Sequence, residues 1–285
     1  MTRKSLFYFA LVGLLWGIPY LLMKVAVEDF PPAAVVAGRT LIGASILIPI
    51  AIYRKKFGGA VLGFKYVAFY ALMEMIGPWI LITTAEQKIN SGLAGLLVST
   101  VPIFATIITS LRGDHSVWQF KRLFGIVVGF IGLILVVGIE SLSGNSDPLS
   151  IAMVIVASMG YAYAVIMVTS NLPLVDGIAI NGLAMAITTV FWAPVAIAQW
   201  PSSISMDSAL SLIALGIFST ALAFILFFKV MAEIGPARSS LVTYLNTAIA
   251  VLLGVIILRE PLTVGIIVGL PLVLVGSYLA SKKTA

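Results

Sequence analysis

One acidic residue stands inside an apolar stretch that is long enough to cross a membrane. Glu74 lies near the middle of residues 66–85, where an ionisable side chain facing lipid costs on the order of 2.5–3.5 kcal/mol. Such side chains face a bundle interior or a wet cavity, and there a carboxyl group can bind a proton or contact an amine. The neighbouring Met73 is typical of cavity lining. Glu74 could equally be a protonated or hydrogen-bonded structural acid between two helices, and the sequence leaves both interpretations open.

The dipeptide Pro78-Trp79 follows one turn later in the same stretch. Proline lacks the amide hydrogen of the helix ladder, so it frees the carbonyl group of Glu74 and bends the helix. In a membrane protein, a freed carbonyl group is tolerated where it lines a cavity. Trp79 lies too deep in the span for the tryptophan belt at the membrane interface. We therefore expect Pro78 and Trp79 to line a cavity, with a simple packing kink as the alternative.

Two aromatic pairs in other apolar stretches are further candidates for substrate contact. Trp16 and Tyr20 are four residues apart, so on a helix they share one face, which could look into the cavity. Tyr161 and Tyr163 fall on opposite faces of a helix, so both cannot point squarely into one cavity. A tyrosine inside a membrane needs a partner for its hydroxyl group, and either a substrate or a neighbouring helix can supply it.

Tyr244 and Asn246 place two polar side chains inside a late apolar run. Hydrogen bonds between helices, worth about 1 kcal/mol each, explain such residues adequately. Because amide and phenol groups also bind small polar substrates, both residues belong to the set of candidate cavity residues.

Arg39 is the only basic residue that lies even partly deep in an apolar stretch. It stands about two turns inside its span, so it can extend to the outer face or pair with Glu28 or Asp29, and we expect a structural role. Phosphate esters would require two or more deep cations, which makes them poor candidate substrates. His115 is the only histidine, and no cluster has the spacing of metal ligands, so neither a metal nor a cofactor is expected.

The amino-acid composition indicates the medium that surrounds these residues. Of the 285 residues, 61% are hydrophobic and 10% are charged, and the mean hydropathy is +1.14, whereas soluble domains carry about 25% charged residues. We predict an all-α polytopic membrane protein, because lipid cannot satisfy exposed backbone groups. Charges and Pro/Gly/Asn/Ser clusters divide the chain into ten expected transmembrane helices, at roughly 6–26, 33–53, 66–85, 91–111, 120–140, 149–169, 177–199, 208–231, 236–258 and 262–281.

The basic residues predict the orientation of these spans. Most of the 17 Lys and Arg residues, including those at both ends of the chain, fall on one side of a ten-span arrangement. Positive residues stay in the cytoplasm, so both termini are expected there, in a multi-pass protein of the plasma (bacterial inner) membrane. The net charge of +6 is therefore a signal of topology, and nucleic acid is not an expected partner.

Parts of the two halves of the sequence resemble each other. Laying residues 5–25 over 148–168 places Gly17 opposite Gly160 and Tyr20 opposite Tyr163, and a second overlay places Gly132 opposite Gly276. The offsets are 143 and 144 residues, about half the chain. We predict two five-helix repeats, residues 1–144 and 145–285. Because five is odd, the repeats must be inverted, as in many secondary transporters with a site between the halves.

Several motifs carry a family resemblance over essentially the whole chain. The stretch LLVSTVPIFATIITSLRGD ends in Asp114. The stretch SSLVTYLNTAIAVLLGVIILREPL contains Arg259 and Glu260 near its end. With the opening residues, they resemble the drug/metabolite transporter (DMT) superfamily in its EamA branch. Within it the chain is most similar to YddG-type exporters of aromatic and other neutral amino acids. The residues that carry the resemblance are Trp16, Gly17, Pro31, Pro32, Arg39, Asp114, Arg259 and Glu260.

The resemblance and the cavity residues together predict a secondary transporter, not an enzyme. It would export small neutral or zwitterionic metabolites, preferentially amino acids, by alternating access through a central cavity. The alternatives are a carrier for another metabolite or drug, and a membrane-embedded enzyme, which would need an acid–base partner that Glu74 lacks. Expected partners are the small-molecule substrate and the lipid bilayer, with proton coupling left open. Glycine faces in the fifth and tenth helices suit a monomer or a weak homodimer.

Overall fold

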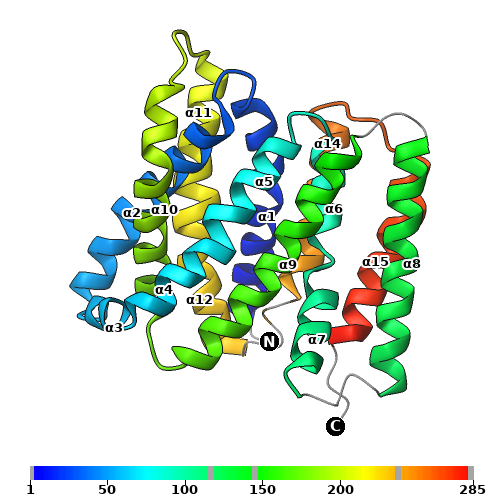
Figure 1. Cartoon of the computed structure of the whole chain (residues 1–285), viewed down its shortest axis with the longest axis horizontal. Helices are drawn as coiled ribbons and strands as arrows, with labels where there is room; N and C mark the ends of the chain where they lie inside the picture. Colours follow the sequence, from blue (N-terminus) through cyan, green and yellow to red (C-terminus); the bar gives the residue numbers. More distant parts are fainter. Residues whose placement is uncertain (1–2, 114–118, 143–146, 235–238, 240, 282–285) are drawn as a thin grey trace.

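The computed structural model describes residues 3–113, 119–142, 147–234, 239 and 241–281. Asp114 and His115, which the sequence singled out, lie outside these residues. Helices are the regular elements of the described part (Figure 1), and they are α1 (Arg3–Ala26), α2 (Pro32–Tyr53), α3 (Phe57–Leu62), α4 (Phe64–Ala71), η1 (Leu72–Ile76), α5 (Gly77–Ala85), α6 (Ser91–Val98), α7 (Val101–Leu111), α8 (Phe120–Leu142), α9 (Pro148–Asn171), α10 (Gly177–Ala198), α11 (Met206–Ala214), η3 (Leu215–Leu222), α12 (Ala223–Ile234), α14 (Val242–Ile256) and α15 (Val264–Ser281).

Seven helical segments in the described part of the chain are long and apolar enough to cross a membrane. Two further apolar helices, Val242–Ile256 and Val264–Leu279, are shorter. These helices confirm the expected polytopic, all-helical class, while the count of ten spans and the inverted arrangement stay predictions. The seven segments are Arg3–Ala26, Pro32–Tyr53, Phe64–Ala85, Ser91–Leu111, Pro148–Asn171, Gly177–Ala198 and Met206–Ile234.

Local sequence signals set where several of these helices begin. Asp176 precedes α10, and its side chain accepts hydrogen bonds from the backbone of Ile178 and Ala179. The Ser205 hydroxyl group does the same for the first turn of α11. Pro32 occupies the first turn of α2, where its missing amide hydrogen costs nothing. These residue types satisfy the free amide groups that open a helix, so the starts of these helices can be read from the sequence.

Two spans are interrupted by π-helical segments, η1 and η3. In η1 the wider turn ends immediately before Gly77 and Pro78, the proline that cannot donate to the ladder. The expected disturbance around Glu74 is therefore present, and it takes the form of a wider turn. π-Helical turns inside α-helices are rare and are found frequently at functional sites.

Glycines set the closest helix contacts. Gly13 and Gly17 of α1 lie against Leu245 and Ile249 of α14, with no room for a Cβ atom. In the α8–α15 pair, which stands to one side of the bundle (Figure 1), a Cβ atom on Gly276 would overlap the backbone of Gly129. The glycine stripes therefore act in packing, as close approach between membrane helices requires.

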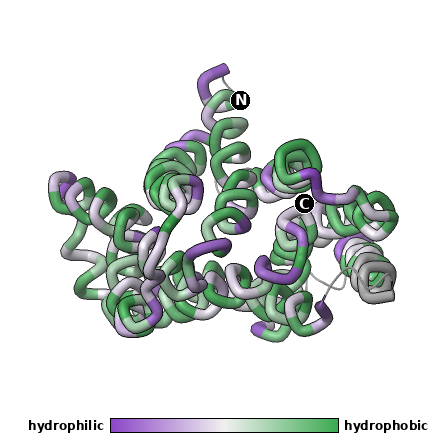
Figure 2. Tube along the Cα trace, turned by 90° about the horizontal axis from the view of Figure 1, so that it is seen from above, coloured by the Kyte–Doolittle hydropathy of each residue, from purple (hydrophilic) through white to green (hydrophobic). Residues whose placement is uncertain are grey.

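The outer surface of the bundle is apolar. Figure 2 shows a tube that is hydrophobic along most of its length, with short hydrophilic patches. Large hydrophobic side chains are exposed on the outer helices, for example Phe7 at 62%, Ile134 at 65% and Val190 at 75%. Exposed apolar area of this extent marks a surface that meets another apolar medium, which for this chain is lipid.

Candidate functional site

The interior of the bundle holds a cavity of about 820 Å³. Both halves of the chain contribute to its walls. Lining residues of the first half lie on α1, α2, η1 and α5, among others, and those of the second half lie on α9, α10, η3, α12 and α14. A cavity of this size is in the range of small-molecule sites, roughly 300–1,000 Å³.

The two ends of the cavity differ. At one end the lining side chains are themselves buried, with Tyr20 at 8%, Met23 at 3% and Ile82 at 2% exposure. At the other end the lining includes Thr169 and Pro173, which are exposed and lie where α9 ends. This end of α9 lies on the same side of the bundle as the N-terminus (Figure 1). The cavity is therefore open on the side of the N-terminus and closed on the opposite side.

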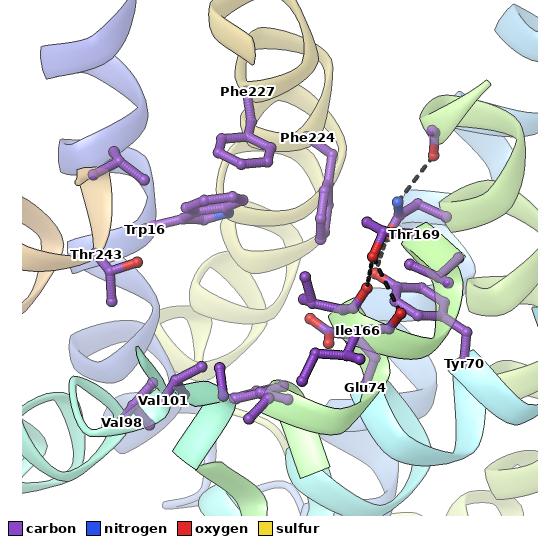
Figure 3. Close-up of a pocket in the computed structure, with 18 of the residues that line it drawn as sticks. Trp16, Tyr70, Glu74, Val98, Val101, Ile166, Thr169, Phe224, Phe227 and Thr243 are labelled. Carbon is purple, nitrogen blue, oxygen red and sulfur yellow. Dashed lines mark hydrogen bonds between the residues drawn. The ribbon is translucent and has the colours of Figure 1, made fainter. Parts of the chain in front are cut away.

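Aromatic side chains form one wall of the cavity. The Trp16 ring lies 4.6 Å from the ring of Phe227 and 5.6 Å from that of Phe224, measured between centroids. Figure 3 shows Trp16 and Phe227 on one side of the cavity, with Glu74 and Tyr70 on the other. Edge-on and tilted contacts of this kind hold the rings in place, so the wall is an apolar, shaped surface.

Arg39 places a buried positive charge in the cavity wall. Its side chain is 5% exposed, and its guanidinium carbon lies 3.8 Å from the centroid of the Trp79 ring. Two of its nitrogens donate to the Thr220 hydroxyl group at 3.2 and 3.3 Å, and the third contacts the sulfur of Met23 at 3.5 Å. Among the described residues, no acidic side chain lies within ion-pair distance of Arg39.

The sequence allowed Arg39 either to extend to the outer face or to pair with Glu28 or Asp29, and the described residues show neither arrangement. Asp29 instead accepts hydrogen bonds from the amide nitrogen of Ser205 at 2.8 Å and from its hydroxyl group at 2.5 Å. These bonds hold the pKa of Asp29 below its ordinary value. The acid next to α2 is thus engaged at the start of α11, and the guanidinium group turns inward onto Trp79.

Glu74 places a carboxyl group in the same cavity. It belongs to η1, and its Oε2 atom is buried without a hydrogen-bond partner among the described residues. The indole nitrogen of Trp192 donates to the carbonyl group of Ile76 at 3.1 Å, which ties the end of the π-helical turn to α10. A buried carboxyl oxygen without a donor is costly, and a ligand in the cavity would remove this cost.

Six of the ten candidate residues line the cavity, namely Trp16, Tyr20, Glu74, Trp79, Tyr161 and Asn246. The other four contact neighbouring helices. The Met73 carbonyl group and the Pro78 ring face Gly160 of α9. The Tyr163 ring lies 5.8 Å from Phe69, and the Tyr244 ring lies 6.2 Å from Tyr278. Tyr161 and Tyr163 thus fall on different sides of α9, as their spacing requires.

Sequence reasoning missed several polar residues of the site. Tyr70 and Asn181 both line the cavity, and the Tyr70 hydroxyl group donates to the Asn181 amide oxygen at 3.1 Å. Ser219 lines it too, with a buried hydroxyl oxygen that has no partner among the described residues. Asn181 carried the same signal as Asn246, an amide inside an apolar run, whereas Ser219 gave no distinctive signal because serine is common in membrane helices.

Apolar helices around a cavity that is closed at one end and lined by opposite charges define a polytopic membrane protein with an internal cavity. The family model of the EamA-like transporter family matches residues 3–138 and again residues 148–282. The chain therefore belongs to the EamA-like transporter family. With its apolar helices, this membership makes it a multi-pass protein of the plasma membrane.

Similar proteins span nearly the same length. The uncharacterized transporter YoaV of Bacillus subtilis (strain 168) is 27% identical over 277 residues, which is 94% of this chain and 93% of the relative. The uncharacterized inner membrane transporter YedA of Escherichia coli (strain K12) is 26% identical over 281 residues, 95% of this chain and 90% of the relative. A crystal structure of a protein 15% identical has a TM-score of 0.67 and covers 98% of this chain and 97% of its own, which shows the shared fold.

Proposed function

We propose that this transporter exports small zwitterionic metabolites, preferentially amino acids, by alternating access through the central cavity. The observation that carries the proposal is the pair of Arg39 and Glu74, which line one cavity without an ion-pair partner among the described residues. Guanidinium groups bind carboxylates strongly, and a carboxylate accepts hydrogen bonds from an ammonium group. A zwitterion supplies both complementary charges in one molecule.

The remaining lining favours neutral side chains on that zwitterion. Trp16, Phe224 and Phe227 offer an aromatic surface, and Tyr70 with Asn181 offers polar contacts. Sites of this composition bind apolar groups by contact area and use a few polar groups for orientation. Aromatic and other neutral amino acids fit this pattern, in which the lining carries two buried arginines, Arg39 and Arg122.

Alternating access draws support from the two halves, which we take as inverted repeats of residues 1–144 and 145–285. Leu72 begins η1 and Leu215 begins η3, so the two π-helical segments begin 143 residues apart, at the offset of the sequence overlay. Two similar halves can exchange conformations around one site. We place both termini in the cytoplasm, as the basic residues predict, so the open end of the cavity would face the cytoplasm, where an exporter loads its substrate.

Counterflow in proteoliposomes tests the proposal. Vesicles preloaded with one unlabelled amino acid are expected to accumulate the same labelled amino acid without chemical change. Screening the proteinogenic amino acids singly, with their decarboxylated amines and deaminated acids, separates zwitterion binding from recognition of one charge. Accumulation of the amines or the acids alone would contradict the zwitterion assignment and favour a carrier for another metabolite or drug, and chemical turnover would favour a membrane-embedded enzyme.

A further inference from the structure

The turn between α5 and α6, residues 86–90, follows Ile82, which lines the closed end of the cavity. Lys24, in the last turn of α1, donates hydrogen bonds from its ammonium group to the carbonyl oxygens of Glu86 at 2.6 Å and Ile89 at 2.9 Å. Carbonyl groups at the C-terminal end of a helix lack partners within the helix and carry partial negative charge. Lys24 therefore fastens the end of α5 to α1.

The second half of the chain holds the same turn from the other side. The Glu260 carboxylate, beyond the end of α14, accepts hydrogen bonds from the amide nitrogen of Ser91 at 2.8 Å, from its hydroxyl group at 2.9 Å and from the amide nitrogen of Gly92 at 3.2 Å. Gly254 makes room for this carboxylate, since an added Cβ atom would overlap its Oε2 atom. Opening this end of the cavity would require the turn to leave Lys24, Glu260 or both.

The Glu86 side chain is buried next to these contacts. The residue is 0% exposed, and neither carboxyl oxygen has a hydrogen-bond partner among the described residues. It is one turn beyond Ile82, which lines the closed end of the cavity. Lys24, the nearest basic residue along α1, bonds the backbone carbonyl group of Glu86 and not its carboxyl group.

The charges around Glu86 come from every side of the closure. Lys24 and Tyr20 lie on α1, Arg39 lies on α2, and Glu260 follows α14. At the rim, Lys88 and Asp147 form an ion pair with a nitrogen–oxygen distance of 3.8 Å. Burial raises the pKa of the Glu86 carboxyl group well above its ordinary value; Lys24 opposes this effect, Glu260 adds to it and Arg39 opposes it.

We propose that Glu86 is a proton-binding site that must be occupied for the outer end of the cavity to close. The proposal rests on the proposed function, because alternating access supplies the two states of the carrier, with the outer end of the cavity closed or open. The proton is assigned to the closed state. In the closed state a charged carboxylate would be buried without a donor, which is costly, whereas the protonated form is tolerated. When the turn moves off Lys24 and water reaches the carboxyl group, Glu86 releases the proton. Each closure takes up one proton and each opening releases one.

The sign of the pH dependence follows from this linkage. A group that binds its proton more tightly in the closed state favours closure as pH falls. Between the pKa of Glu86 in the open state and its pKa in the closed state, the closing equilibrium shifts about tenfold per pH unit. An acidic exterior would therefore return the carrier to the state that is open to the cytoplasm. Glu74 lies on the wall of the cavity and not in its closure, so the two acids have separable effects.

Spin-label distances can measure this equilibrium directly, because the chain contains no cysteine. Gln87→Cys and Met206→Cys would place labels on exposed residues at the closed end, one in each half. Double electron–electron resonance in nanodiscs is expected to show a longer distance population that grows as pH rises. Adding Glu86→Gln should keep the short distance at every pH. An equal pH response with and without Glu86→Gln would overturn the proposal, and so would a response driven by Na⁺ at constant pH.

Infrared spectroscopy gives a second readout that needs neither motion nor a substrate. In a Glu74→Gln background, the carboxylic-acid C=O band near neutral pH should fall when Glu86→Gln is added. It should not change when Glu28→Gln is added, because Glu28 is exposed in the α1–α2 turn. An unchanged band in the Glu86 variant would overturn the proposal. Neither experiment uses an amino acid, so failure of the proposed substrate class shows in counterflow alone and is distinguished from failure of the proton site.

Discussion

The spans Phe64–Ala85 and Met206–Ile234 share a backbone feature and differ in chemistry. Each contains a π-helical segment, and these segments begin 143 residues apart, at Leu72 and Leu215. In the first span the segment carries Glu74 with a buried oxygen that lacks a partner. In the second it carries Thr220, whose hydroxyl group accepts from Arg39. The position 143 residues beyond Glu74 is Ile217, at 36% exposure.

This contrast separates what a repeated backbone preserves from what a binding site requires. A wider helical turn can be kept in both halves because it depends on local geometry and on a neighbouring helix. The proposed zwitterionic substrate, however, has two different ends, so its site needs an acid on one wall and an oriented cation on another. The first half supplies Glu74 and Arg39, and the second half supplies the hydroxyl group that orients Arg39.

Removing the cation is expected to have the largest effect on this arrangement. Arg39→Gln should lower amino-acid counterflow about 100-fold, because a charge-assisted hydrogen bond to the substrate carboxylate is lost. Arg39→Lys should recover only part of the rate, since lysine cannot offer the planar fork. Arg54→Gln, at an exposed position just beyond α2, is the matched control. Wild-type counterflow by Arg39→Gln would remove Arg39 from the binding site.

Removing the acid should have a smaller and more selective effect. Glu74→Gln is expected to raise the counterflow KM for amino acids about tenfold, by weakening the contact with the substrate ammonium group. Deaminated analogues should be affected less. The same variant, assayed for uptake driven by a pH gradient, also tests energy coupling. Unchanged gradient-driven uptake would remove Glu74 from any coupling role.

The Thr220 hydroxyl group, which accepts hydrogen bonds from Arg39, allows a finer test of the span Met206–Ile234. Thr220→Val keeps the shape of the side chain and removes the acceptor for two Arg39 nitrogens. We expect KM to rise roughly fivefold, the equivalent of about 1 kcal/mol. Ser219→Ala, one residue away, is the matched comparison, because its hydroxyl group holds no described partner. Equal effects of the two variants would contradict the orienting role of Thr220.

The smallest expected effect concerns Asp29, which does not line the cavity, and it is a change in protein stability at acidic pH. The hydrogen bonds from Ser205 hold the pKa of Asp29 below its ordinary value of 3.8. The folded state thus binds the proton less tightly, so this contribution to stability is complete above pH 3.8 and is lost as pH falls through the lowered pKa. Asp29→Asn should flatten that part of the melting-temperature curve in detergent. An identical slope in wild type and Asp29→Asn would contradict the link.

The sequence predicted much of the fold and part of the site. The expected third span, 66–85, is seen as Phe64–Ala85, and the expected seventh, 177–199, as α10. The late span, expected at 236–258, is the shorter α14 in the described residues. Helix existence follows from composition, whereas helix ends depend on caps and neighbours. For the site, the sequence selected Trp16, Glu74 and Trp79, all of which line the cavity, but it did not place Arg39 in the cavity wall and did not select Glu86.

The sequence alone determined the medium and the local backbone. Its hydropathy requires helices in lipid, Pro78 requires a disturbed turn after Glu74, and Asp176 and Ser205 mark the starts of helices. These effects act over a few residues, so they can be read along the chain.

Only the tertiary structure decided which charges are satisfied. Whether Arg39 meets Asp29 or Trp79 depends on where Ser205 lies, 176 residues from Asp29. Whether Glu86 is solvated or sealed depends on Lys24 of α1 and on Glu260, which lie on separate segments. The energy of a buried charge is set by neighbours that are distant in sequence. The closed end of the cavity and its proton site therefore emerge only when the helices are packed.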